Sequence, residues 1–154
     1  MTPAELITRK MKAALEASGV TLPVDSLLLE ALAGEKHASK ASSIVLNVHV
    51  AEQLHEPLPM YSFSAIVALT VSLDDDKGGG LFVENYDAIW AELKRLSLSD
   101  NCTALGDEGD ETETHIFAVD GFQLGEGDPP DFAEDENGGT WTTTFAATIT
   151  GRAS

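Results

Sequence analysis

The segment YSFSAIVALTVSL, residues 61–73, alternates apolar side chains with mostly small or hydroxyl-bearing ones along its whole length. Alternation with a period of two places successive side chains on opposite faces of a β-strand. One face of this strand then carries Tyr61, Phe63, Ala65, Val67, Leu69, Val71 and Leu73. The pattern predicts a long strand with one strongly apolar face, which must be covered by another element.

Three further segments read as strands. Residues 43–50 place Ile44, Leu46, Val48 and Val50 on one face, and residues 141–150 place Trp141, Thr143, Phe145, Ala147 and Ile149 on one face. Threonine dominates the second face of 141–150, which suits a half-exposed strand. Residues 115–124 resemble a strand interrupted by Gly121, where we expect a bulge.

Two helices are predicted with clear boundaries. Thr2 and Glu5 form a capping box around Pro3, and apolar residues recur at helical spacing until Gly19, so a helix is expected over residues 3–18. In residues 81–98, three- and four-residue intervals separate Phe82, Tyr86, Ile89, Leu93 and Leu96. This second helix should lie on the apolar face of the sheet.

The remaining segments are expected to be short connections. Asp25 can cap a short helix at 27–32 that Gly34 ends, followed by an exposed polar linker at 35–42. A turn is expected at Pro57-Leu58-Pro59. Loops are expected at 74–80, 101–113 and 125–139, the last two being acidic and containing glycine.

These elements predict one α+β domain over residues 1–154, which is an ordinary length for a single domain. Residues 1–34 form an N-terminal helical segment, and residues 43–151 form the sheet with its helix at 81–98. We expect a four-stranded, largely antiparallel or mixed sheet, with the long helix packed on one face and an N-terminal helix beside it.

The charge is strongly negative, with 26 acidic residues, nine basic ones and a net charge of −17. Thirteen of the acidic residues and no Lys or Arg lie between residues 96 and 151, whereas five basic residues lie in the first quarter. Such a field repels phosphate, so sequence-specific nucleic-acid binding is disfavoured. Acidic loops that only keep the protein soluble are the simpler explanation of this charge.

No signal peptide or membrane-spanning segment is recognisable. The single cysteine, Cys102, excludes an intrachain disulfide. The four histidines lack ligand spacing, the acidic runs do not match an EF-hand, and Gly78-Gly79-Gly80 lacks the Lys-Ser/Thr ending of a phosphate loop. We therefore expect no catalytic residue, cofactor or metal site.

Some residues are nevertheless candidates for contacts with other macromolecules. The large side chain of Trp90 sits at the edge of the apolar stripe of its helix, either as the margin of the core or as an anchor for a partner. The candidate interface residues are Trp90 and two acidic clusters, Asp74, Asp75, Asp76 and Asp107, Glu108, Asp110, Glu111.

Over nearly the whole chain, the element order resembles the tail terminator, or tail-completion, proteins of long-tailed bacteriophages. The similarity lies in the N-terminal helix, the Ile44-Val45-Leu46 strand, the long strand running into an acidic turn, the helix ending Trp90-Ala91-Glu92-Leu93, and the final threonine-rich strand closing with Gly151-Arg152.

The resemblance implies a non-enzymatic virion protein that is made in the host cytoplasm. Such proteins form a ring, usually of six subunits, which ends the tail tube and joins it to the head. The implied partners are further copies of the chain, the tail tube protein and the head–tail neck proteins, with DNA passing through the lumen unread. Two alternatives remain: an acidic DNA mimic that inhibits a nucleic-acid-binding host protein, and a small hydrolase or isomerase that uses scattered carboxylates.

Overall fold

The computed structural model describes residues 3–26, 42–54, 60–76, 78, 80–106, 117–135 and 138–153. These residues form an α+β fold with two α-helices, α1 (Pro3–Ala17) and α3 (Gly80–Leu96), and the 3-10 helix η1 (Asn101–Leu105). Its six strands are β1 (Val24–Ser26), β2 (Ser43–Leu54), β3 (Met60–Ser72), β4 (Phe117–Leu124), β5 (Asp131–Asp135) and β6 (Gly138–Ala153).

The strands form one mixed sheet in the order β1-β2-β3-β6-β4, and β5 pairs with β6 as well. Only β1 and β2 are parallel to each other, and every other pair is antiparallel. The four predicted strands are thus present as β2, β3, β4 and β6, but the predicted number of strands is wrong.

The two additional strands, β1 and β5, have no alternating apolar pattern from which they could have been predicted. β1 has three residues and is held by backbone bonding, with the amide of Ile44 donating to the carbonyl of Pro23 at 3.1 Å. β5 lies in the acidic segment expected to be a loop, and it pairs with the first five residues of β6. Backbone hydrogen bonds do not depend on side-chain type, so they can hold both segments in the sheet without an alternating apolar pattern.

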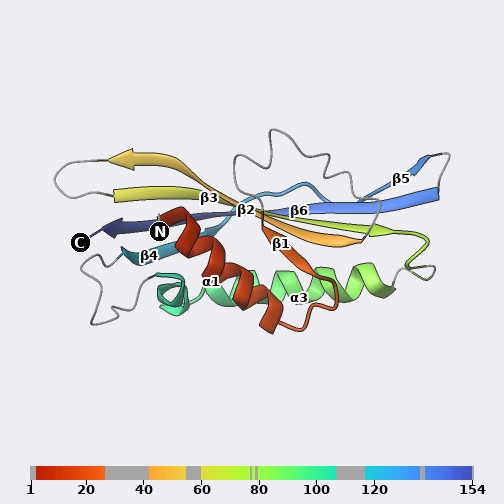
Figure 1. The fold of residues 1–154 in the computed structure, drawn as a ribbon, viewed down its shortest axis with the longest axis horizontal. Coiled ribbons are helices and arrows are strands. Elements are labelled where there is room, and N and C mark those ends of the chain that lie inside the picture. The colour runs from red at the N-terminus through yellow and green to blue at the C-terminus, as the bar shows by residue number, and fades with distance from the viewer. Residues whose placement is uncertain are drawn as a thin grey trace.

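Both α-helices lie on the same side of the sheet (Figure 1). α1 packs on β1 and β2, and α3 packs on β3 and β4. The side chains between the helices and the sheet form the core, which includes Ile7, Met11, Ile44, Leu46, Phe63, Val67, Leu69, Ile89, Leu93 and Ile149. The prediction that the second helix covers the apolar face is confirmed.

The ends of the elements agree in part with the sequence. α1 begins at Pro3 and is followed by Gly19, whose φ of +102° is accessible mainly to glycine. Asp25, expected to cap a helix, lies in strand β1 instead. Thr2 of the capping box, the expected helix at 27–32 and the expected turn at 57–59 lie outside the described residues.

Two bulges bend the sheet. The predicted one is confirmed, because the register of β4 against β6 shifts between Val119 and Gly121. A Cβ atom on Gly121 would overlap the hydroxyl of Thr150, so a larger residue there would require the Thr150 side chain to move. The second bulge lies between Val50 and Glu52 in β2 and was not predicted.

Candidate interaction surfaces

The sheet has an open face on the side away from α1 and α3, over which no described helix lies (Figure 1). On β3 and β6 it carries Ile66 and a set of small side chains, all of intermediate or full exposure; the small ones are Ser62, Ser64, Ala68, Thr70, Thr142, Thr144, Ala146, Thr148 and Thr150. Between residues 62 and 70 and between 142 and 150 there is no charged residue. Among the described residues, charged groups occur toward its margins; one of them is Asp120, which accepts a hydrogen bond from Thr150 at 3.1 Å.

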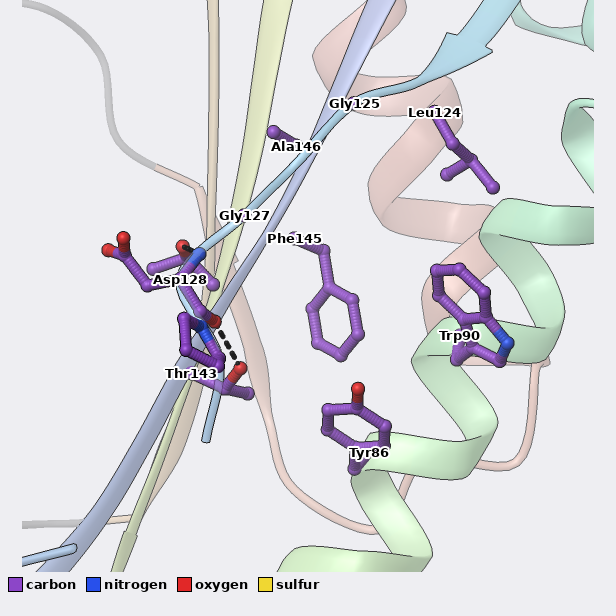
Figure 2. Close-up of a pocket in the computed structure, with 11 residues that line it drawn as sticks. Tyr86, Trp90, Leu124, Gly125, Gly127, Asp128, Thr143, Phe145 and Ala146 are labelled. Atoms are coloured by element: carbon purple, nitrogen blue, oxygen red, sulfur yellow. Dashed lines mark hydrogen bonds between the residues drawn. The ribbon is translucent and has the colours of Figure 1, made fainter. Parts of the chain in front are cut away.

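A groove lies on the helix side of the sheet, between α3 and the segment that links β4 to β5 (Figure 2). Tyr86 and Trp90 come from α3, and Phe145 comes from β6. The opposite wall is the segment 124–129, and the enclosed volume is about 140 Å³. In Figure 2 the rings of Tyr86, Trp90 and Phe145 gather on one side of this space.

Hydrogen bonds hold the outer wall of the groove in place. The carbonyl of Asp128 accepts from the amide of Thr144 at 3.2 Å and from the hydroxyl of Thr143 at 2.7 Å. The amide of Asp128 donates to the hydroxyl of Thr144 at 2.7 Å, and the amide of Gly125 donates to the carbonyl of Ala146 at 2.9 Å. The wall is therefore anchored to β6 by backbone and side-chain bonds together.

Gly127 explains why this wall lies so close to the sheet. A Cβ atom at this position would overlap the carbonyl oxygen of Thr144. At Gly125, by contrast, the nearest atom to such a Cβ is 3.7 Å away, which is ordinary contact. Only glycine at residue 127 allows the wall to approach β6 this closely.

Aromatic packing fixes the inner wall. The ring centroids of Tyr86 and Phe145 are 5.0 Å apart, and those of Phe82 and Trp141 are 5.5 Å apart. Both pairs join α3 to β6, at a spacing where aromatic rings attract each other. Trp90, one turn beyond Tyr86, remains 44% exposed and borders the groove.

The groove has aromatic rings on one side, polar and backbone groups on the other, and a negative rim. Its only carboxylate is Asp128, and the exposed Asp87 and Glu126 lie next to groove residues in the chain. Among the described residues, no three His, Cys, Asp or Glu side chains group closely enough to hold a metal ion. The arrangement is suited to receiving an apolar side chain whose neighbours are neutral or basic.

The cluster Asp74, Asp75 and Asp76 is divided by the fold. Asp74 and Asp75 are exposed, although Asp75 accepts a hydrogen bond from the hydroxyl of Ser42 at 2.6 Å. Asp76 is buried, with its carboxylate accepting from the amide of Phe82 at 2.8 Å in the first turn of α3. Asp76 thus stabilises the helix start, and its burial removes it from any exposed interface.

Of the other predicted interface residues, Trp90 is exposed, and Asp107, Glu108, Asp110 and Glu111 lie outside the described residues. The sequence prediction missed the outer wall of the groove. A usable signal exists in Gly125-Glu126-Gly127-Asp128-Pro129-Pro130, because two glycines followed by two prolines in an acidic segment favour a close backbone approach.

Asn85 is a second residue that the sequence reading missed. It is fully buried in α3, where its side-chain oxygen accepts from the amides of Thr21 and Leu22 at 2.9 and 3.2 Å. Its side-chain nitrogen donates to the hydroxyl of Thr21 and to the carbonyl of Leu81. Asn85 therefore ties the chain after α1 to α3.

Cys102 is buried in η1, and this burial raises the pKa of its thiol. A raised pKa leaves less thiolate at neutral pH, so the residue is a poor nucleophile.

None of the helices formed by the described residues combines the length and apolarity needed to span a membrane. Comparison with known proteins identifies no family, because no protein-family model matches the chain and no curated protein sequence matches it.

Proposed function

We propose that this protein is a non-enzymatic structural protein of a bacteriophage virion, which assembles into a ring that ends the tail tube and joins tail to head. The observation that carries the proposal is the open face of the sheet. Of the acidic residues that the structure describes, none belongs to the central part of this face, formed by β3 and β6. Because its central part is uncharged, this face is suited to a different role from that of the charged surfaces of the protein.

In the proposed ring, the open face lines the bore through which DNA passes. Lysine or arginine side chains there would hold phosphates by releasing counterions. Serine and threonine hydroxyls carry no fixed charge, so they neither trap nor repel the DNA. The described acidic residues lie mainly on α1 and α3 and along 126–135, which favours a neutral lining.

The remaining surfaces then contact protein. Copies of the chain meet around the ring, and the tail tube protein and the neck proteins contact its two ends. Six is the ring size that the family resemblance implies. A DNA mimic fits the surface less well, because it would need carboxylates spread like phosphates over a continuous face.

The decisive experiment is native mass spectrometry of the purified protein, combined with electron microscopy of the protein mixed with tail tubes. A ring of identical subunits bound at the end of tubes is the expected result. A protein that stays monomeric at high concentration and does not bind tubes would rule the proposal out. Tight, salt-sensitive binding to a nuclease by such a monomer would instead favour the DNA mimic.

The lining has its own test. Replacing the exposed Thr142 and Thr148 with lysine should leave the ring assembled but make it retain DNA, measured by co-sedimentation at low salt. The matched control carries lysine at Asp87 on α3, on the other side of the sheet. If that control retains DNA equally well, the open face does not line the bore.

A further inference from the structure

The two lateral edges of the sheet are different and complementary. On one edge β1 pairs only with residues 44–46 of β2, so the rest of β2 has no strand on that side among the described residues. On the other edge lie β4, the groove wall and β5. We will refer to these as the β2 edge and the groove edge.

Charge distinguishes the two edges. α1, which packs beneath the β2 edge, contains Arg9, Lys10 and Lys12, three of the six basic residues that the structure describes, together with Glu5 and Glu16, and β1 and β2 contribute one acidic residue each. The groove edge from residue 117 to 135 contains six acidic residues and no basic one. The basic segment 9–12 of α1 attracts the anionic groove edge when two copies meet through unlike edges, whereas two groove edges repel.

Each edge also exposes one large apolar side chain on the helix side of the sheet. Val50 of β2 is 45% exposed, and it is paired across the strands with Phe63, whose side chain is buried on the helix side. Trp90, at the groove, is 44% exposed. A contact between unlike edges would remove both from water at once, and an aromatic residue beside a preformed groove is a typical anchor of an interface.

Strand direction permits the same contact. β2 runs antiparallel to β3, β3 to β6, and β6 to both β4 and β5, so β2 is antiparallel to both strands of the groove edge. A second copy that keeps its orientation can therefore place its β2 edge antiparallel to the groove edge of the first. Repetition of one unlike contact produces a closed ring when the rotation between neighbours brings the last copy back to the first.

We propose that neighbouring copies meet head to tail, with the β2 edge and α1 of one copy against the groove edge of the next. The proposal rests on the proposed ring and names the contact that would build it. Val50 covers the groove beside Trp90, and Arg9 and Lys12 of α1 face Glu126 and Asp128. The open faces of all copies then point toward the axis of the ring.

The test uses two variants that each damage one edge, Trp90→Asp and Val50→Asp. Each variant alone should be monomeric by native mass spectrometry, because every contact in a ring of one variant includes a damaged edge. An equimolar mixture should form dimers of one copy of each variant and nothing larger, since only one intact pairing remains. Leu98→Asp, at another exposed apolar residue beyond α3, is the matched control and should form rings.

Charge reversal provides an independent test that does not disturb apolar packing. Arg9→Glu with Lys12→Glu, or Glu126→Lys with Asp128→Lys, should each weaken association at least tenfold. Combining all four substitutions should restore it to within about threefold of the original protein, because the attraction is re-created with exchanged signs. Asp128 holds the groove wall through its backbone, so the wall should survive its replacement.

The outcomes separate this inference from the proposed function. Rings that persist in both aspartate variants, or monomeric variants whose mixture forms no dimer, would overturn the head-to-tail contact and leave the ring itself standing. An original protein that never associates would remove both. Circular dichroism confirms that each variant is folded, and the charge-reversal set decides the question if an aspartate variant is not.

Discussion

The two faces of the sheet are formed by the same strands but differ in burial and in what they contribute to folding. On β3, the side chains of Phe63, Val67 and Leu69 are at most 1% exposed, whereas the intervening Ser64 and Ala68 retain intermediate exposure. The covered face supplies the hydrophobic free energy of folding, and the open face contributes little to it. The alternation of apolar and small side chains therefore encodes the fold on one side of the sheet and leaves the other side free for a different purpose.

Polar groups follow the same division. On the helix side, the buried carboxylate of Asp76 and the buried amide of Asn85 each make specific hydrogen bonds to main-chain amides. On the open face, hydroxyls can be satisfied by water, so none is needed for folding apart from that of Thr144, which accepts a hydrogen bond from the amide of Asp128. A substitution on the covered side should therefore be costly, and a similar one on the open side should be tolerated.

The largest expected effect is that of Val67→Asp, which places a carboxylate on the covered face of the central strand. Val67 is 1% exposed, so the charge has neither water nor a basic partner. We expect the variant to lose about 4 kcal/mol or more of unfolding free energy, enough to unfold many domains of this size. Urea unfolding followed by circular dichroism measures this loss.

The matched control is Thr148→Asp on the open face of β6, where the side chain is exposed. Its cost should stay within about 1 kcal/mol, reflecting only the poor strand propensity of aspartate. If both variants unfold, or if Val67→Asp remains as stable as the original protein, the assignment of faces is wrong.

A smaller effect is expected from Asn85→Leu, which keeps the number and branching of the side-chain heavy atoms but removes all four hydrogen bonds of the amide. The amides of Thr21 and Leu22 would lose their partner in a partly buried place. We expect a loss of about 2 to 4 kcal/mol, and faster hydrogen exchange at these two amides than in the original protein. Asp87→Asn, an exposed change on the same helix, should alter neither the unfolding free energy nor the hydrogen exchange of these amides. Unchanged exchange at residues 21 and 22 in Asn85→Leu would contradict the role given to Asn85.

The sequence predicted those parts of the fold that depend on periodic burial. The strand at 61–73, the helix at 81–98 and the bulge at Gly121 each have a repeating apolar pattern or a backbone requirement that is visible locally. β1 and β5 have neither, because their pairing uses backbone groups that every residue carries. Such strands can be recognised only once the neighbouring strand is in place.

The candidate surfaces were harder to predict for a related reason. Trp90 was recognised as lying at the margin of the core, but the groove beside it depends on a wall some 35 residues later in the chain. Asp76 has the same side chain as Asp74 and Asp75, and only its position relative to the first turn of α3 buries it. Asn85 lies at helical spacing between Phe82 and Ile89, so its burial could have been noticed.

Gly127→Ala should have a moderate effect that is confined to the groove edge. The added Cβ would overlap the carbonyl oxygen of Thr144, so the wall must move away from β6. We expect a loss of about 1 to 3 kcal/mol, accompanied by a change in tryptophan fluorescence from Trp90 at the groove. Gly125→Ala is the control, because its Cβ would meet only ordinary contacts, and equal effects in the two variants would show that the tight approach at residue 127 is not important.

The smallest effect concerns Cys102, on the covered side, and it appears only in alkaline solution. Burial raises the pKa of this thiol, so the folded protein holds the proton more tightly than the unfolded chain does. The resulting stabilisation is fully present below the thiol pKa of the unfolded chain, about 8.5, and is lost as the pH rises from there through the higher pKa of the folded state. Between pH 7 and pH 9.5, the unfolding free energy measured with urea should therefore decline more for the original protein than for Cys102→Ala. The Cys102→Ala variant is a suitable control because it keeps all the other groups that titrate in alkaline solution. Equal declines, or rapid alkylation of the native thiol at pH 7, would show that Cys102 is not enclosed by the covered layer.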